Sequence, residues 1–557
     1  MKASNTDAND AFGTSVAISG NTAVVGAPAE DSTANSVDGN QANNAGNNQG
    51  AAYVFVRENG VWSQQAYLKA ANSGALDNFG TSVGISGNLI IVGAPREDGG
   101  TNGLNAIPDD SASDAGAAYL FSRSGSSWSQ TLYIKASNSG LGDRFGQSVA
   151  ISGGTFIVGA PNEDSGSTIT EWVDADETEQ AGAAYVFAFN RFTYVQQAYL
   201  KASNTGANDG FGTSVAVHAE LLASEAAFAI VGAPFEDTTA SDSGAAYGYL
   251  RVGGVWTFVN QLKANNAGAD DEFGHSVAMS GTTVVVGAPM EDSPGSGVNG
   301  GTGDGANNAG AAYVFELPAF AWEQTAYLKA IANDDGVGNN FGAGVSVSEN
   351  LIVVGAPLED SDSVGVDGSQ ENEGANNSGA AFVYRRSGSS WISQSYLKAS
   401  NTSVGDQFGG AVAVSGETAI VGAFDEDSGA TGVGGSQGSG AFASGASYIF
   451  SLTPAVATPG ATVDVVGPTL QVRGRKTVET LRKRVVIRGS VADVSGVSRI
   501  IVKAGGAKVR KTRLRGNGTW KSVSKVRKDR GRVIVRIRAV DNVGNSSAQK
   551  KVRILRR

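Results

Sequence analysis

Cysteine is absent from this chain of 557 residues, and histidine occurs only at His218 and His275. The lack of thiols excludes disulfides, thiolate metal sites and a cysteine nucleophile, and two histidines argue against a histidine-built zinc site. No apolar run approaches the 18 or so residues of a membrane-spanning helix, so no membrane span is predicted. Glycine is abundant at 77 residues, and charged residues make up only 17%. These features indicate a turn-rich, all-β protein.

Acidic and basic residues are distributed unevenly along the chain. Residues 1–467 contain 15 lysines and arginines against 49 acidic residues, a net charge of −34, whereas residues 468–557 contain 27 against 4, a net charge of +23. The stretch LTPAVATPGATVDVVGP, which precedes this change, is typical of a linker. We therefore expect two domains, residues 1–451 and 468–557, joined by a linker of residues 452–467.

The stretch FGTSVAISGNTAVVGAPAED begins at Phe12 and returns six more times, at intervals of 62 to 68 residues. Each copy predicts four short strands, which are SVAIS, TAVVGAP, GAAYVF and WSQQAYLKA in the first copy. One such sheet buries too little apolar surface by itself, whereas seven sheets around an axis form a β-propeller. We expect the regularly spaced aromatic residues to pack within and between blades. They are Phe12, Phe79, Phe145, Phe211, Phe273, Phe341 and Phe408, with Trp62, Trp128, Trp256, Trp322 and Trp391.

Each Phe-Gly pair is followed by Gly-Ala-Pro at a fixed interval, as in Gly26-Ala27-Pro28, and the seventh copy departs from this only as Gly422-Ala423-Phe424. This pattern resembles the FG-GAP repeats that form the seven-bladed propeller of integrin α chains. The resemblance covers residues 1 to about 451 and implies a single closed ring. It says less about function, because propellers host many activities.

Acidic residues recur on both sides of the first two predicted strands. A Glu-Asp pair follows the second strand in every copy, and an Asp precedes the first strand in every copy except the sixth, which has Asn339. Because successive strands run antiparallel, both positions lie on the same face of the ring. The candidate ligand-binding residues of this face are Asp10, Glu30, Asp31, Asp77, Glu97, Asp98, Asp143, Glu163, Asp164, Asp209, Glu236, Asp237, Asp271, Glu291, Asp292, Glu359, Asp360, Asp406, Glu426 and Asp427.

Two interpretations of these acids remain open. They can cap backbone N–H groups of the loops, as short polar side chains do in turns, and their presence in every blade favours this. They can also form an acidic face that binds cations or a basic partner. The loops that follow the pairs contain 17 or 18 residues in six copies and six residues in the fourth.

Calcium sites of the integrin type are not predicted. The resemblance implies Asp-rich loops between the first two strands, but most copies have only a short turn there, such as SGN at residues 19–21. The acid-rich stretches DADETE, from Asp174, and DSDSVGVDGSQENE, from Asp360, could bind calcium, although their spacing fits no ligand scheme. We therefore expect no metal site, no cofactor and little calcium dependence of folding.

The two ends of the repeat region do not match. Met1-Lys2-Ala3 aligns with the end of a fourth strand (Leu68-Lys69-Ala70), and no fourth strand follows the seventh copy. Either the ring closes with a three-stranded blade, or natural residues that complete it, including an export signal, precede Met1. The alignment favours the second alternative.

Residues 468–557 alternate apolar and charged positions, as in GRVIVRIRAVDNVGN, which predicts a small β-sandwich anchored by Trp520. The stretches VADVSGV and AVDNVGNSS resemble bacterial immunoglobulin-like modules. A nucleic-acid partner is not expected, because aromatic residues for base stacking are scarce and no DNA-binding motif is present. A polyanionic glycan, or docking onto the acidic propeller, is favoured for this basic module, and the alternative is that its lysines and arginines form only a solvated surface.

The sequence favours a non-enzymatic recognition or adhesion protein, extracellular or at the cell surface, that binds a protein or glycan through the acidic propeller face. The alternative is a glycan-binding, lectin-like propeller. A carbohydrate-active enzyme is third, because glycoside chemistry needs two carboxyl groups in unlike environments and every blade offers the same pair.

The opposite charges of the two predicted domains generate a test. The linker keeps them at high effective concentration, and their attraction is screened over about 8 Å at physiological ionic strength. We expect the isolated 468–557 module to elute from a heparin column at higher salt than the full chain. Equal elution would show that the propeller does not mask the basic surface.

Overall fold

The computed structural model describes two compact units, Met1–Thr453 and Pro454–Arg557. In the first unit the described residues are 1–453 except 167–177, 220–225, 304, 331–337, 371, 436 and 439. In the second unit only the backbone of the strands is described. The finer domain boundaries at residues 451 and 468 stay predictions.

The first unit consists of seven antiparallel sheets in chain order, which confirms the prediction of an all-β propeller with seven blades. Six sheets contain the four expected strands, the fifth has the short β19 in addition, and the seventh has three. The strands are β1 (Ser15–Ser19), β2 (Thr22–Ala27), β3 (Ala51–Glu58), β4 (Val61–Leu68); β5 (Ser82–Ser86), β6 (Leu89–Ala94), β7 (Ala117–Ser124), β8 (Ser127–Ile134); β9 (Ser148–Ser152), β10 (Thr155–Ala160), β11 (Ala183–Phe189), β12 (Tyr194–Leu200); β13 (Ser214–Ala219), β14 (Ala227–Ala233), β15 (Ala245–Val252), β16 (Val255–Leu262); β17 (Ser276–Ser280), β18 (Thr283–Ala288), β19 (Gly297–Val298), β20 (Ala311–Glu316), β21 (Glu323–Lys329); β22 (Val345–Ser348), β23 (Leu351–Ala356), β24 (Ala380–Ser387), β25 (Ser390–Leu397); and β26 (Val412–Ser415), β27 (Thr418–Ala423), β28 (Ala446–Ser451).

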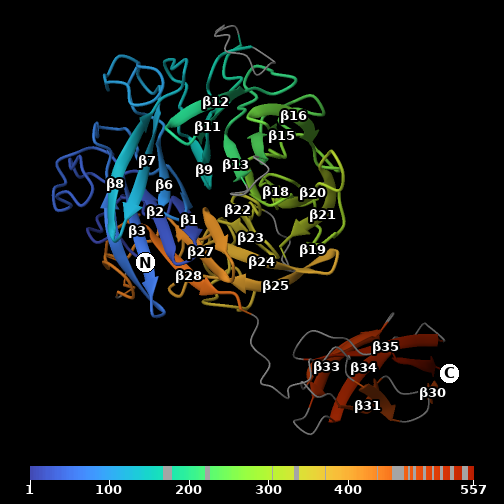
Figure 1. Ribbon diagram of the computed structural model, residues 1–557. Helices are drawn as coiled ribbons and strands as arrows, with labels where there is room; N and C mark the ends of the chain where they lie inside the picture. The colour runs from blue at the N-terminus through green and yellow to red at the C-terminus, as the bar shows by residue number, and fades with distance from the viewer. Residues whose placement is uncertain are drawn as a thin grey trace. The chain divides into compact units, whose positions relative to one another are not determined.

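The first strands of the blades form the inner circle of the ring. Each contacts the first strand of the next blade, from β1 with β5 through β22 with β26, and the contact of β26 with β1 closes the circle (Figure 1). The second strands, such as β2, are buried along almost their whole length, because they have a strand on either side and a neighbouring blade on either face. Their continuous apolar sequence reflects this position.

The Phe-Gly and Gly-Ala-Pro sequences meet where neighbouring blades touch. All seven phenylalanines are at most 1% exposed, as predicted, and Phe12 contacts Tyr53 and Phe55 edge-on. The glycine after each phenylalanine has a φ of 97–102°, which only glycine adopts easily. A side chain on Gly26 would overlap the carbonyl oxygen of Gly80 in the next blade, and Gly422 stands in the same relation to Gly13. The repeated motif is therefore the contact between blades.

The tryptophans of the fourth strands also pack as expected. Trp128, Trp256, Trp322 and Trp391 are 3–5% exposed, whereas Trp62 is half-buried. An arginine of the third strand lies over the indole ring in four blades, for example Arg123 over Trp128 at 5.0 Å. Such cation–π contacts stabilise the packing of the arginine against the indole ring.

The N-terminal residues join the seventh blade. Met1 and Ser447 of β28 exchange two backbone hydrogen bonds, the arrangement that Leu68 has opposite Ala52 in the first blade. Lys2 then pairs with Glu426, and Phe12 donates its backbone N–H to Ser444. The first and last blades are thus joined by the same contacts that join the others.

The described backbone of the second unit forms eight strands in two sheets, whose strand orders are β29-β31-β34-β33 and β30-β36-β35-β32. The strands are β29 (Thr469–Arg473), β30 (Thr477–Thr480), β31 (Arg484–Ala492), β32 (Val497–Ala504), β33 (Ala507–Leu514), β34 (Thr519–Val526), β35 (Arg532–Asp541) and β36 (Lys550–Arg556). The expectation of an immunoglobulin-like sandwich stays a prediction, and the side chain of Trp520 lies outside the described residues.

The contact between blades can be tested with two glycines of the second blade. In Gly93→Ala the new methyl group would overlap the carbonyl oxygen of Gly146, and we expect a loss of about 3 kcal/mol or more in the free energy of unfolding. The matched control is Gly84→Ala in β5, a position where β1 already has Ala17. Its methyl group would meet only the side-chain ends of Ile91 and Ile151, at 3.1 and 3.3 Å, so its cost should stay below about 1 kcal/mol. Urea denaturation measures both, and similar losses in the two variants would contradict the proposed role of the Gly-Ala-Pro glycine.

Candidate functional site

The loop face of the propeller consists of the segments that follow the second strands and those that precede the first strands. Each Glu-Asp pair stands at the base of the loop between the second and third strands of its blade. The backbone N–H of Gly50 donates to the carbonyl oxygen of Glu30 at 2.9 Å, which closes the first of these loops at its base. The same bond joins Gly244 to Glu236, where the loop has only six residues.

The glutamate of every pair is buried and pairs with the lysine that ends the fourth strand. All seven glutamates are 1–3% exposed. The lysine nitrogen lies 2.8–3.0 Å from the carboxylate in six blades, and Lys263 pairs with Glu236 in the remaining one. The pairs are Lys2–Glu426, Lys69–Glu30, Lys135–Glu97, Lys201–Glu163, Lys263–Glu236, Lys329–Glu291 and Lys398–Glu359. The prediction from sequence overlooked these lysines.

Further hydrogen bonds satisfy both members of the pair, as burial of charge requires. Lys69 also donates to the carbonyl oxygens of Ser32 and Gly50, at 2.8 and 2.7 Å. Glu30 accepts from the hydroxyl of Tyr67 at 2.9 Å. In four other blades the tyrosine two residues before the lysine likewise donates its hydroxyl to the glutamate. Burial lowers the pKa of Lys69, and the carboxylate of Glu30 opposes this shift.

After six of the seven lysines, an asparagine three residues further on reaches the glutamate of the next blade. Asn72 donates to Glu97 at 2.9 Å, and Asn5 donates to Glu30 at 2.8 Å. The same bond is present at Asn138, Asn204, Asn266 and Asn401. Each lysine therefore holds the glutamate of its own blade, while the following asparagine connects that lysine's segment to the next glutamate.

The sixth blade departs from this scheme in two positions at once. In most blades a tyrosine of the third strand donates to the asparagine, as Tyr185 does to Asn138 at 2.7 Å. The sixth blade has Phe382 in place of this tyrosine, and the sequence has Ala332 in place of the asparagine. Residue 332 lies outside the described residues. Phe382 has no hydroxyl group and therefore needs no acceptor at this position.

The aspartate of each pair holds the far end of its loop. Asp31 accepts the backbone N–H of Asn48 at 2.7 Å, and Asn48 has the left-handed φ of 50°. Five other blades have the equivalent bond, formed by Asp98, Asp164, Asp292, Asp360 and Asp427. Asp237 in the short loop of the fourth blade is exposed instead. The aspartate therefore holds the end of the loop in the six blades whose loop is long.

The aspartates before the first strands are buried, with exposures of 1–4%. Each accepts the backbone N–H of the residue three positions earlier, for example Gly74 to Asp77 at 2.6 Å. Burial raises the pKa of Asp10 to about 8, those of Asp77 and Asp406 to about 7, and that of Asp209 to about 6. The backbone hydrogen bond opposes this shift, and nearby carboxylates add to it.

Thirteen of the twenty candidate ligand residues are thus buried, namely the seven glutamates and Asp10, Asp77, Asp143, Asp209, Asp271 and Asp406. The six aspartates accept backbone N–H groups, as the capping interpretation expects. The glutamates chiefly pair with lysines, which neither interpretation included. The seven aspartates of the Glu-Asp pairs are at least partly exposed. Contact of these aspartates with a ligand stays a prediction.

No group of three or more acidic or histidine side chains is arranged to hold a metal ion in the part of the chain that the structure describes. Most of the acid-rich stretch from Asp174 lies outside that part. Within it there is also no helix of the length and hydrophobicity that a membrane span requires.

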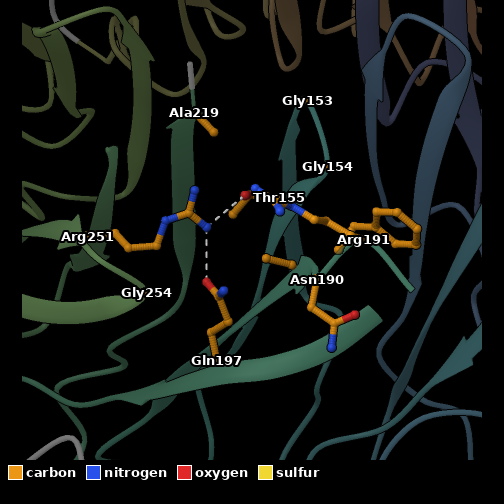
Figure 2. Close-up of a pocket in the computed structure, with 11 residues that line it drawn as sticks. Gly153, Gly154, Thr155, Asn190, Arg191, Gln197, Ala219, Arg251 and Gly254 are labelled. Atoms are coloured by element: carbon orange, nitrogen blue, oxygen red, sulfur yellow. Dashed lines mark hydrogen bonds between the residues drawn. The ribbon is translucent and has the colours of Figure 1, made fainter. Parts of the chain in front are cut away.

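A pocket of about 390 Å³ lies on the opposite side of the third and fourth blades, at the turns between strands. Figure 2 shows Arg251 extending toward Thr155 and Gln197, to which it donates at 3.1 and 3.0 Å. Arg123 of the second blade donates in the same way to Thr22 and Gln65 of the first blade. This arginine is therefore part of the repeated packing and does not distinguish the pocket as a binding site.

The raised pKa of Asp77 generates a prediction about pH. The folded pKa of about 7 exceeds the unfolded value, so the folded chain binds more protons between pH 4 and 7, and stability falls as the pH rises through this range. Asp77→Asn removes this effect and keeps the acceptor for Gly74. We expect it to raise the free energy of unfolding by about 2 kcal/mol at pH 8, with little change at pH 4.

The sixth blade supplies the matched control, because it has the buried Asn339 at this position. Asn339→Asp should destabilise the protein at pH 8 and much less at pH 4. Denaturant titrations at the two pH values measure both variants, and a stability of Asp77→Asn that falls with pH as steeply as that of the wild type would contradict the assignment.

Three of the solved structures that match the chain have low sequence identity to it. The chain is 19% identical to a mutant of the SrpA adhesin from Streptococcus sanguinis, over 17% of this chain and 60% of that one, with a TM-score of 0.14. It is 21% identical to the sialic acid binding region of the Streptococcus sanguinis SK1 adhesin bound to 3′sLn, over 17% and 31%, with a TM-score of 0.15. The chain is 10% identical to an endo-fucoidan hydrolase of glycoside hydrolase family 107, over 44% of this chain and 33% of that one, with a TM-score of 0.13.

The chain covers less than two thirds of each of these three structures, and likenesses at such TM-scores carry no argument about function. No curated protein matches the chain. The family model described as FG-GAP repeat matches seven segments, residues 1–55, 62–121, 128–187, 194–249, 256–315, 322–384 and 391–450. Each segment after the first spans the fourth strand of one blade and the first three strands of the next, so the seven segments follow the seven-blade repeat. Together they cover more than half of the chain, and the protein therefore belongs to the FG-GAP repeat family.

Proposed function

We propose that this protein is a non-enzymatic recognition or adhesion protein, extracellular or at the cell surface, and that its loop face binds a protein or glycan ligand. The observation that carries the proposal is the contrast between the base of the loops and their middle. At the base, the same lysine, glutamate and aspartate contacts recur in blade after blade. Between those contacts the loops differ in sequence.

The composition of the loops supports binding. The loop of residues 32–49 reads STANSVDGNQANNAGNNQ, and that of residues 293–309 reads SPGSGVNGGTGDGANNA. Serine, glycine and asparagine supply adaptable hydrogen bonds in recognition loops. Variable loops on a rigid support are a common way to place binding residues. Since residues 1–467 have a net charge of −34, a partner with positive charge or many hydroxyl groups suits this face.

The carboxyl groups give little support to an enzyme. A glycosidase requires one carboxyl group in an environment unlike that of its partner. The pKa of a buried aspartate is raised in four different blades, and in each of them the group accepts a backbone N–H from its own turn. These groups therefore resemble one another and lie beneath the surface. A polyanionic glycan remains the proposed partner of the basic C-terminal unit.

The fourth blade provides the means to test the proposal. Its six-residue loop, Thr238–Ser243, closes on the same backbone bond as the long loops do, so it should replace residues 99–115 without loss of the fold. We expect such replacements, made one blade at a time, to weaken binding at least tenfold in one or more blades. The probes are a glycan array and a panel of immobilised extracellular proteins, which distinguish the two ligand classes.

The control changes the opposite face of the same blade. The turn Gly125-Ser126 between β7 and β8 is replaced by Asn-Gly, the pair that forms the equivalent turn at Asn59-Gly60. This variant should bind as the wild type does. Binding that survives all six loop replacements would show that the loop face is not the binding surface.

A further inference from the structure

A pocket of about 330 Å³ lies on the loop face of the second blade. Three segments line it, which are Ala71 and Asn72 before β5, Pro108 and its neighbours in the loop between β6 and β7, and residues 130–133 of β8. The volume is at the lower end of the range for sites that bind small molecules, which begins at about 300 Å³. The pocket therefore has the size of a small-ligand site within the proposed binding surface.

Two other blades close the equivalent space with a hydrogen bond. In the first blade Ser4 donates to the side chain of Gln41, and in the seventh blade Gln437 donates to Ser400 at 2.7 Å. Both pairs are 37 positions apart. In the second blade the same spacing joins Ala71 to Pro108, and neither side chain can form such a bond. The pocket thus lies where both partners of the closing bond have been replaced.

The replacement also leaves two amide groups with free donors. In the first blade Gln64 donates its amide N–H to Ser4 at 2.9 Å. The equivalent Gln130 instead accepts the backbone N–H of Ala71 at 3.0 Å, and its amide nitrogen has no partner among the described residues. Asn105 likewise uses its side-chain oxygen for a backbone N–H of β8, at 3.1 Å. Both amides line the pocket, so each can donate to a ligand.

The chemistry of the lining indicates a neutral sugar. Hydroxyl groups accept from amide N–H groups and can donate in turn. Pro108 and Leu132 supply apolar surface for the C–H groups of a sugar ring. Asp109 and Asp110 follow Pro108 in the loop and are exposed, and residues 1–467 have a net charge of −34, so a ligand with a negative charge would be repelled.

We propose that the pocket of the second blade binds a neutral sugar residue of a glycan, with Gln130 and Asn105 donating to its oxygen atoms. This inference rests on the proposed function, because it specifies the class of ligand and the blade that binds it. The remaining long loops are not required for this contact.

The test closes the pocket in the way that the first blade does. Ala71→Ser together with Pro108→Gln restores the pair Ser4–Gln41 at the equivalent positions and should abolish binding. The fold should be retained, because two other blades already contain this pair, and the melting temperature checks this. The matched control is Ala319→Ser with Pro318→Gln, the same two exchanges in the exposed turn between β20 and β21 on the opposite face. The control should bind as the wild type does.

Binding is measured by saturation-transfer NMR on the full-length protein. The probes are the methyl glycosides of glucose, galactose and mannose, with N-acetylneuraminic acid as the acidic comparison. We expect at least one neutral glycoside to bind and the acidic sugar not to bind. Gln130→Met keeps the length of the side chain but removes its donor, and should weaken binding about tenfold. Gln64→Met, the same exchange in the first blade, should leave binding unchanged.

The outcomes separate this inference from the proposed function. Neutral glycosides that bind equally well after Ala71→Ser with Pro108→Gln would overturn the inference, as would a preference for N-acetylneuraminic acid or a failure of every neutral glycoside to bind. If loop replacements in other blades still weaken binding of a protein or glycan, the proposed function stands without this pocket. Binding that survives every loop replacement would overturn both.

Discussion

The buried pair of lysine and glutamate in each blade is the interaction on which the loop face depends. Removal of both charges from water is costly, and loss of one partner from such a pair typically costs 3–5 kcal/mol because the other remains buried alone. The main effect of the lysine–glutamate pair is therefore to specify which strand ends meet. The glutamate at the end of the second strand must meet the lysine at the end of the fourth, as Glu30 meets Lys69. This requirement fixes where the strands end and where the intervening loop begins.

The same residues couple the blades to one another. Asn72 belongs to the segment that carries Lys69, yet it donates to Glu97 of the next blade. The backbones of neighbouring blades also touch, because Gly26 has no side chain and the carbonyl oxygen of Gly80 occupies the space that one would fill. Side-chain and backbone contacts thus repeat at every boundary, including the one between Lys2 and Glu426 that joins the first residues of the chain to the last blade. A local change at one boundary therefore acts on two blades.

The sequence predicts much of the fold and less of the site. Seven copies of Phe-Gly, six of them followed by Gly-Ala-Pro and one by Gly-Ala-Phe, predict seven blades and the burial of residues such as Phe12, because a contact between blades must recur in every blade. The role of Glu30 is harder to predict, since its partner is 39 positions away and no local periodicity connects the two. A signal was nevertheless present, because seven of the 15 basic residues among residues 1–467 are the lysines of these pairs. A basic residue that recurs as often as an acidic one indicates a pair.

The fourth blade shows what the long loops do for the frame beneath them. With only six residues after Asp237, the side chain of Lys263 is 20% exposed, whereas the other six lysines are 0–7% exposed. The long loops therefore act as covers that keep water from the ion pairs. Because Glu30 and Asp31 hold the two ends of such a loop, substitutions in its middle leave these contacts in place. The constraint that buries the charges therefore acts at the ends of each loop and leaves the middle of the loop free to differ in sequence from blade to blade.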